Sequence, residues 1–195
     1  MEMSPFNVKY ASTTSLDRAY RVYFEDAEFY FLRIGGQGGD IVLDVIDATF
    51  STVAGAFIGV VTTRSVIGAI IFAIIGWILG SLLQKKARES QARHINALDQ
   101  SHPKLHLNEH KHNFKLNPVD LQDSRIEPPS FFPLHGPEMG RWISNRKDGR
   151  KIDLHFEDTE NLKTAVGSLP EILGQKLIMN VAWNEKNKRF TKLNS

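Results

Sequence analysis

The sequence predicts an α+β fold, namely a small antiparallel β-barrel or sandwich with one helix in its C-terminal half and an inserted apolar helical hairpin. Three observations lead to this prediction. Runs of alternating apolar and polar residues, typical of strands, occur near the N-terminus and again after residue 113. A stretch after residue 158 has apolar residues at helical spacing. Between the two strand-forming regions, residues 65–84 contain no charged residue.

The composition limits the classes of protein to which the chain can belong. Its 195 residues suffice for one domain with a hydrophobic core, or for one domain and an appendage. The 24 basic residues nearly balance the 22 acidic ones, whereas a dedicated nucleic-acid binder usually shows a dominant basic field. The absence of cysteine excludes disulfides, thiolate catalysis and cysteine zinc sites. We therefore expect no nucleic-acid partner, and no motif indicates a cofactor.

The first strand-forming region is predicted to be a hairpin. Residues 1–17 are polar and mixed, and we expect a loose arm there. From Arg18 onward, two strand-like runs are separated by a turn at Glu25–Asp26. The second run, Glu28 to Ile34, is rich in the aromatic and β-branched residues that favour strands. The glycine-rich stretch after it lacks the ending of a phosphate-binding loop, so we interpret it as a flexible exit that completes the segment 18–40.

The region after the apolar segment is predicted to hold the remaining strands and the helix. In "FKLNPVDLQDSRIE", two short strands flank a turn at Asn117–Pro118. The run "RWISNRKDGRKIDLHFED" is a clear hairpin, because its Asp148–Gly149 pair favours turns with positive φ. A helix is expected to begin at 158–159, to bend or restart at Pro170, and to end at Gly174. A last strand pair, or a strand and a tail, completes the chain.

These pieces, in this order, resemble the pleckstrin-homology-like and GRAM-like family of small barrels, in its bacterial form. The likeness rests on the opening hairpin "YRVYFEDAEFYFLRI", on the two segments quoted above and on the helix after them. It implies that residues 18–40 and 113–195 form one split domain, in which the helix plugs an open end of the barrel. The turn "FEDAE" is acidic, so the phosphoinositide binding of some family members is not expected here.

Residues 65–84 have the length of a transmembrane helix. Twenty helical residues span about 30 Å, which is the thickness of the hydrocarbon core of a bilayer. Trp77 lies toward the C-terminal end, and a basic cluster follows at once, as expected at the cytoplasmic boundary of a membrane span. The basic cluster consists of Lys85, Lys86 and Arg88. We interpret residues 85–112 as a charged helix followed by a polar connector.

The whole insert is predicted to be a glycine-rich helical hairpin over residues 45–84. If both flanks form one domain, the two ends of the insert must lie on the same side of the membrane, which a single crossing does not allow. Small residues four positions apart let helices approach closely in lipid, as in a glycine zipper. The residues expected at the helix contact and the membrane interface are Gly55, Gly59, Gly68, Gly76, Gly80 and Trp77.

Two further groups of residues suggest chemistry, each with a simpler interpretation. His106 and His110 would share one helix face at a spacing that suits a metal ion. Their surroundings are polar, so a solvated linker is the favoured interpretation and no metal site is predicted. A loop with polar groups beside aromatic rings could line a ligand pocket, although its phenylalanines could equally cover the core. That loop contains Phe131, Phe132, His135 and Arg141.

The sequence thus predicts a membrane-anchored, non-enzymatic binding or scaffold protein. Its barrel would lie on the cytoplasmic side and bind a protein or lipid partner, with membrane lipid and self-association through the apolar helices as further partners. The alternative is a soluble, cytoplasmic protein whose apolar helices form an oligomer interface or a hydrophobic-ligand pocket. An enzyme that uses the loop around His135 ranks behind both, because no nucleophile, base and carboxylate are recognisable together in the sequence.

Overall fold

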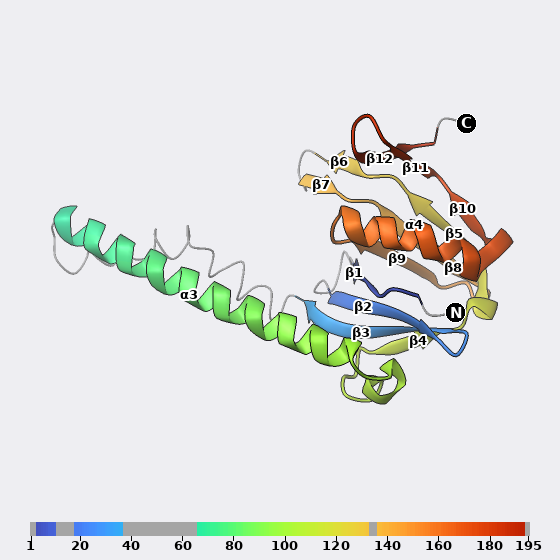
Figure 1. Ribbon diagram of the computed structural model, residues 1–195, viewed down its shortest axis with the longest axis horizontal. Coiled ribbons are helices and arrows are strands. Elements are labelled where there is room, and N and C mark those ends of the chain that lie inside the picture. Colours follow the sequence, from blue (N-terminus) through green and yellow to red (C-terminus); the bar gives the residue numbers. More distant parts are fainter. Residues whose placement is uncertain (1–2, 11–17, 37–65, 133–135, 194–195) are drawn as a thin grey trace. The chain divides into compact units, whose positions relative to one another are not determined.

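A computed structural model describes residues 3–10, 18–36, 66–132 and 136–193. The chain divides into two compact units, one formed by Met1–Ile34 with Leu98–Ser195 and the other by Gly35–Ala97 (Figure 1). We call the first the β unit and the second the insert unit. The strands and the helix α4 belong to the β unit.

An eight-stranded sheet with the order β10-β5-β8-β9-β1-β2-β3-β4 forms the centre of the β unit. The pairs β1–β2, β1–β9, β3–β4, β5–β8 and β8–β9 are antiparallel, and β10 runs parallel to β5. Its strands are β1 (Phe6–Tyr10), β2 (Arg18–Glu25), β3 (Glu28–Gly36), β4 (Phe114–Leu116), β5 (Leu121–Glu127), β8 (Arg141–Arg146), β9 (Lys151–Phe156) and β10 (Leu177–Met179). Two small pairs accompany it: β6 (Ser130–Phe132) with β7 (Gly136–Glu138), and β11 (Val181–Asn184) with β12 (Arg189–Lys192).

The sheet is not closed as a barrel in the described part of the chain, since β10 and β4 lie at its two edges. The mixture of helix and antiparallel strands expected from the sequence is confirmed, and the closed barrel is not. The strand before and the strand after the insert meet directly, because β3 pairs with β4 through Phe29 opposite Leu116. Chain segments on both sides of the insert thereby share one sheet.

Part of the segment 1–17, which was expected to be a loose arm, forms a strand. Phe6–Tyr10 form β1, which pairs with β2 on one side and with β9 on the other. Phe6 and Val8 alternate with polar neighbours and are fully buried, so this short run has the period of a half-buried strand. Residues 11–17 lie outside the described residues.

Two hairpins depend on backbone conformations that few residues adopt easily. Asp26 and Ala27 both have positive φ, 51° and 60°, which shifts the turn between β2 and β3 one residue beyond the expected position. Positive φ at both central residues is the requirement of the tight turns that match strand twist. In the β8–β9 hairpin, Gly149 has φ +83°, and the Asp148 carboxylate accepts a 3.1 Å hydrogen bond from the Arg150 amide. This second hairpin agrees with the prediction.

Helix α4 (Thr159–Leu173) covers one face of the sheet (Figure 1). The Asp158 carboxylate caps it by accepting a 2.8 Å hydrogen bond from the Asn161 amide, and Gly174 ends it with φ +53°. Pro170 lies inside the helix, one turn before its end, so the helix does not restart there, which was one of the two expectations. Its buried residues point into the core and are Leu162, Ala165, Leu169 and Leu173.

The core lies between α4 and the sheet and is rich in aromatic side chains. Trp142 is 1% exposed, and its ring centroid lies 5.3 Å from that of Phe29 and 6.2 Å from that of Phe6. Burying an aromatic side chain of this size contributes several kcal/mol through area alone, and such ring pairs add about 1 kcal/mol each.

The insert unit contains α3 (Val66–Asp99), whose last two residues already belong to the β unit. The apolar segment and the charged segment after it form one continuous helix of 34 residues rather than two elements. The other half of the expected hairpin, including Gly55 and Gly59, lies outside the described residues. Among the residues that the structure describes, no helix combines the length and apolar character needed to cross a bilayer, so the expected transmembrane helix is not supported there.

Candidate functional site

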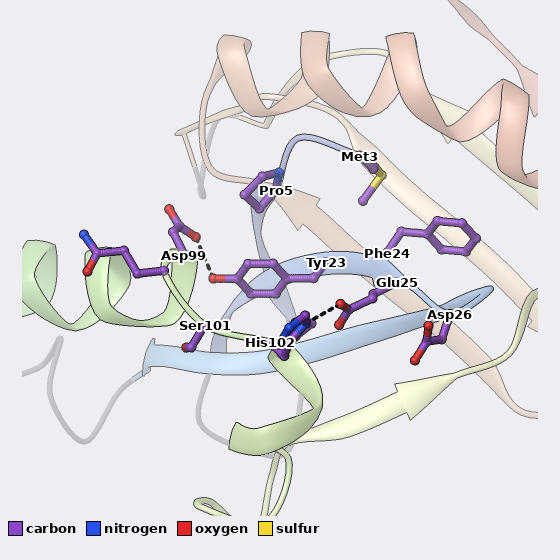
Figure 2. Close-up of a pocket in the computed structure, with 11 residues that line it drawn as sticks. Met3, Pro5, Tyr23, Phe24, Glu25, Asp26, Asp99, Ser101 and His102 are labelled. Atoms are coloured by element: carbon purple, nitrogen blue, oxygen red, sulfur yellow. Dashed lines mark hydrogen bonds and ion pairs between the residues drawn. The ribbon is translucent and has the colours of Figure 1, made fainter. Parts of the chain in front are cut away.

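A cavity of about 620 Å³ opens at one end of the β unit. Three chain segments line it: the N-terminal segment, the end of β2 with its turn, and the end of α3 with the following loop (Figure 2). The loop leads into η1 (Pro103–His106), a short 3-10 helix. The lining residues are Met3, Pro5, Tyr23, Phe24, Glu25, Asp26, Asp99, Gln100, Ser101, His102 and Pro103. The wall is apolar on the side of the N-terminal segment and polar along the loop.

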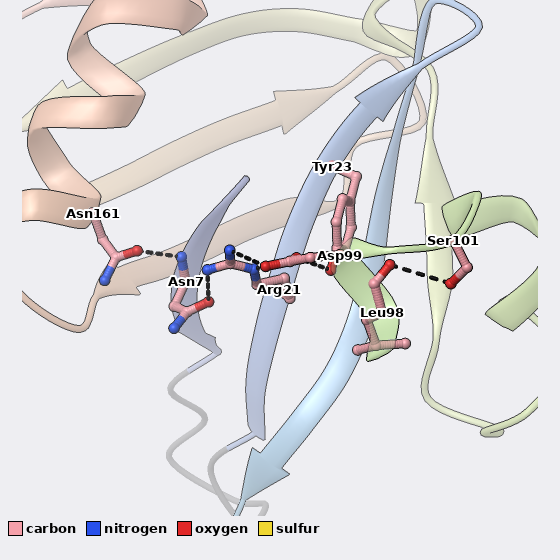
Figure 3. A network of polar contacts seen from close by, with 7 residues as sticks. All are labelled: Asn7, Arg21, Tyr23, Leu98, Asp99, Ser101 and Asn161. Carbon is pink, nitrogen blue, oxygen red and sulfur yellow. Dashed lines mark hydrogen bonds and ion pairs between the residues drawn. The ribbon is translucent and has the colours of Figure 1, made fainter. Parts of the chain in front are cut away.

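Asp99 is the centre of a polar network on the cavity wall (Figure 3). Arg21 donates two hydrogen bonds to it, from Nε to Oδ1 at 3.0 Å and from Nη2 to Oδ2 at 2.8 Å. Tyr23 adds a third, from Oη to Oδ1 at 2.6 Å. A forked pair between a guanidinium and a carboxylate fixes geometry as well as contributing energy. The last residue of α3 is thereby held against β2.

The network continues across β1 to the start of α4. Arg21 also donates from Nη1 to Oδ1 of Asn7 at 3.0 Å, and the backbone amide of Asn7 donates to Oδ1 of Asn161 at 2.6 Å. Since the amide of Asn161 is itself bonded to Asp158, the capped end of α4 is tied to the same chain of contacts. Side chains from β1, β2, the end of α3 and the start of α4 therefore form one connected network beside the cavity.

The phenol of Tyr23 is strongly biased toward its neutral form. Its pKa lies well above the ordinary value of 10, first because the ring is buried and second because the hydroxyl donates to the Asp99 carboxylate. Ionising Tyr23 would place a negative oxygen beside a carboxylate in a partly desolvated position. Tyr23 is consequently a hydrogen-bond donor, and not a base, throughout the physiological pH range.

A second polar contact closes the loop onto the β2–β3 turn. Nδ1 of His102 lies 2.6 Å from Oε1 of Glu25. The hydrogen bond to Glu25, and then its charge, raise the pKa of His102 above its ordinary value. Glu25 and the neighbouring Asp26 give this rim of the cavity a negative character. The imidazolium form of His102 offsets part of that charge.

A smaller cavity of about 330 Å³ adjoins the first and shares two of its lining residues, Met3 and Phe24. Its other wall is formed by α4 residues Thr164, Gly167, Ser168, Glu171 and Ile172. Met3 is 7% exposed and packs into the core cluster, so it separates the two spaces. The N-terminal segment that was expected to be loose thus forms a wall of both cavities.

The ligand loop expected around His135 is not the part of the chain that lines these cavities. Phe131 and Phe132 lie in β6, and His135 lies outside the described residues. Arg141 begins β8, where its guanidinium faces two carboxylates, with Nε 3.9 Å from Glu138 and Nη1 3.8 Å from Asp153. Both distances are long and the groups are partly solvated, so this cluster contributes little to stability.

The two histidines considered for metal binding do not share a helix face. His106 ends η1 and His110 lies in the turns after it, so the helical spacing on which the idea depended is absent. Nε2 of His110 lies 2.9 Å from Nη1 of Arg33, and burial and this cation lower the pKa of His110. In the part of the chain that is described, no group of three potential ligands could hold a metal ion.

Residues of the apolar half of α3 are largely exposed. Trp77 exposes 54% of its surface, whereas Gly80 is buried and Gly76 is intermediate. Gly68 also lies in α3. The three residues of the basic cluster, Lys85, Lys86 and Arg88, are exposed, and Lys85 approaches Glu89 at 4.0 Å. None of these residues contributes to the two cavities described above.

Sequence reasoning missed the residues that form the main cavity. Asp99 was interpreted as part of the charged helix, His102 as part of the polar connector after it, and Tyr23 as one position of a strand. No local pattern connects them, because the contact between Tyr23 and Asp99 spans 76 residues. The alternation of Phe6 and Val8 was the one available signal, since it would have placed the N-terminal segment beside β2.

No protein-family model, curated protein or solved structure matches the chain. The resemblance to pleckstrin-homology-like barrels therefore stays a prediction. The fold defines a mixed α/β unit with an open, mainly antiparallel sheet, and its main cavity combines an apolar wall with carboxylates and hydroxyls. Such a cavity is suited to hold a ligand or a partner side chain by shape and hydrogen bonding.

Proposed function

We propose that the protein is a membrane-associated binding protein, in which the apolar half of α3 is buried in lipid and the β unit binds a partner. The observation that carries the proposal is the exposure of large apolar side chains on α3. Each exposes between 44% and 71% of its surface: Ile67, Ile70, Ile71, Ile74, Ile75, Trp77, Ile78, Leu79 and Leu82. Burying one such side chain is worth about 1.5–3 kcal/mol, so this surface favours a non-aqueous environment.

The width of the exposed apolar surface favours lipid over a flat protein interface. At 100° per residue, Trp77 and Leu79 mark its two edges, which are roughly 200° apart. A helix that packs on one globular surface typically shows an apolar stripe of about 100°. On the remaining side, the small residues Ala73, Gly76 and Gly80 are less exposed, and so is Phe72. A surrounding apolar medium fits the broad side better than a single partner helix does.

The basic residues that follow the apolar half of α3 also favour a position at a lipid surface. Lys85, Lys86 and Arg88 are exposed directly after it. Basic residues at a membrane surface are each attracted to anionic headgroups by about 1 kcal/mol, within a Debye length. The proposal needs burial in lipid and does not need a helix that crosses the bilayer. The hairpin over 45–84, the split pleckstrin-homology-like barrel and the cytoplasmic position of the β unit remain predictions beyond it.

Vesicle flotation tests the proposal. The full chain is mixed with vesicles of phosphatidylcholine and phosphatidylserine and centrifuged through a density gradient. The wild type is expected to float with the vesicles. The variant Ile70→Ser/Ile74→Ser/Ile78→Ser is expected to stay at the bottom, because it removes the centre of the exposed apolar surface.

A matched control changes three apolar residues of the β unit that are at least as exposed as those of α3. Leu105→Ser/Val119→Ser/Ile178→Ser removes side chains that are 55% to 70% exposed, and this variant is expected to float like the wild type. A wild-type protein that stays at the bottom as a monodisperse species overturns the proposal. If that species is a dimer or larger and the α3 variant is a monomer, the alternative of an oligomer interface replaces it.

A further inference from the structure

Three side chains beside the main cavity have the arrangement of a nucleophile, a base and an orienting carboxylate. Oγ of Ser101, which lines the cavity, lies 2.5 Å from Nε2 of His106. The other ring nitrogen, Nδ1, lies 2.9 Å from Oε2 of Glu109. In serine hydrolases and their convergent variants, Nε2 receives the proton of the serine and Nδ1 faces the carboxylate. The same two nitrogens face the same two groups here.

Local structure explains why these residues meet within nine positions of the chain. A turn closed by the Glu109 amide and the His106 carbonyl, at 3.1 Å, brings the carboxylate back to the ring. The side chain of Asn113 donates to the same carbonyl at 2.8 Å, which fixes the backbone that carries the imidazole. Nδ1 is buried, and its contact with Glu109 is close but poorly aligned for a hydrogen bond, so the carboxylate acts mainly through its charge.

The hydroxyl proton of Ser101 has two acceptors within reach. Leu98 offers its carbonyl at 3.3 Å, as in an ordinary helix-end contact, and His106 offers Nε2 at 2.5 Å. The shorter contact favours His106, because hydroxyl donors bind at about 2.7–2.8 Å and weaken with distance. In the tautomer that carries the ring proton on Nδ1, beside Glu109, Nε2 is the acceptor. This is the protonation pattern that activates a serine.

We propose that Ser101, His106 and Glu109 form a catalytic site for acyl transfer, with a small carboxylic ester bound in the 620 Å³ cavity as substrate. The proposal goes beyond the binding function proposed above and does not depend on it. The apolar wall, with Met3, Pro5 and Phe24, would hold the acyl chain. The carboxylates of the rim would repel an anionic leaving group and so favour neutral or cationic alcohols.

The reaction balances without a cofactor. Oγ of Ser101 attacks the ester carbonyl carbon while its proton passes to Nε2 of His106. The tetrahedral oxyanion then collapses, the bond to the leaving oxygen breaks, and Nε2 returns the proton to that oxygen. A water molecule attacks the acyl-serine in the same way and releases the acid, with His106 again receiving and returning one proton. Glu109 stabilises the imidazolium that forms in each half.

Labelling with an alkyl fluorophosphonate tests the proposal, because this probe forms a stable adduct only with an activated serine. The full chain is incubated with the probe, and the modified residue is found by peptide mass spectrometry. Adduct is expected at Ser101 in the native protein and not after heat denaturation. Ser130 is an internal control in the same sample, since its hydroxyl donates to the Glu138 carboxylate at 3.1 Å rather than to an imidazole.

Variants separate catalysis from a structural role of the same contacts. His106→Gln is expected to slow labelling of Ser101 by about a hundredfold or more, which is the usual effect of a general base, and Glu109→Gln to slow it by less. Hydrolysis of p-nitrophenyl butyrate should fall in parallel. Labelling of Ser101 no faster than Ser130 in the wild type overturns the proposal without any variant. Undiminished labelling in folded His106→Gln overturns it as well.

Discussion

The hydroxyl of Tyr23 donates a 2.6 Å hydrogen bond to the carboxylate of Asp99, the residue at which α3 ends. The bond joins a strand of the first hairpin to a residue that follows the whole insert. Because Arg21 binds the same carboxylate through two nitrogens, the chain re-enters the β unit at a defined point. The side chains of Arg21 and Asp99 are 16% and 30% exposed, so the contact is only partly screened by water.

Asp99→Ala should destabilise the β unit more than Tyr23→Phe does. The first change leaves Arg21 and the Tyr23 hydroxyl without their shared acceptor, for an expected loss of about 2–3 kcal/mol in the free energy of unfolding. The second removes one donor and leaves the ion pair, for a loss of about 1 kcal/mol. Urea denaturation followed by circular dichroism measures both. Equal losses would show that the ion pair with Arg21 contributes nothing.

The buried hydroxyl pair in the sheet should show a non-additive effect. Ser124 and Ser144 are 0% and 1% exposed, and their Oγ atoms lie 2.6 Å apart. Ser144→Ala leaves a buried hydroxyl without this partner, at an expected cost of about 1–3 kcal/mol. The double variant Ser124→Ala/Ser144→Ala should be close to the wild type, because no polar group then remains. A double variant with the sum of both single losses would contradict this account.

Alanine substitutions at two glycines should have opposite signs. Gly140 has φ +111°, and a Cβ there would lie 2.9 Å from the Glu127 carbonyl oxygen, so Gly140→Ala should cost about 1–3 kcal/mol or more. Gly167 lies inside α4, and a Cβ there would meet no atom within 4 Å. Gly167→Ala should therefore stabilise the protein by about 1 kcal/mol. Thermal denaturation of the two variants tests the contrast, and a loss of stability in both would refute it.

The pKa values of His102 and His110 should be shifted in opposite directions. Glu25 raises the pKa of His102, whereas burial and Arg33 lower that of His110. The contact of His102 therefore stabilises the fold fully below the unfolded value of about 6.5, and the contribution is lost as the pH rises through the folded pKa. Glu25→Gln should move the NMR titration of His102 to lower pH and leave that of His110 in place. An unchanged His102 midpoint would exclude the Glu25 contact in solution.

Local features of the fold could be predicted, because their causes lie within a few residues. The Asp148–Gly149 turn, the Asp158 cap and the Gly174 stop all appear where their chemistry places them. The order of strands could not be predicted in the same way. β1 lies between β2 and β9, and that position depends on burial of Phe6 and Val8 against residues more than 100 positions away.

The candidate site could not be predicted for a related reason. Its residues come from the N-terminal segment, from a strand and its turn, and from the end of a helix with the connector after it, and only the folded β unit brings them together. Ser101, His106 and Glu109 are close in sequence, yet their spacing matches no helical or strand period. The turns after η1 create the arrangement. The apolar surface of α3, in contrast, follows directly from the uncharged run at residues 65–84 of the sequence.

The environment of the side chain at position 74 tests most directly the claim that the apolar half of α3 is buried in lipid. The chain has no cysteine, so Ile74→Cys and Ala92→Cys each carry one fluorescent NBD label, on the apolar and the charged half of α3. Both positions are exposed on the isolated chain. In phosphatidylcholine–phosphatidylserine vesicles, we expect nitroxide lipids to quench the label at Ile74 and aqueous iodide to quench the label at Ala92. Quenching at Ile74 by iodide, with no effect of nitroxide lipids, would contradict burial of α3 in lipid.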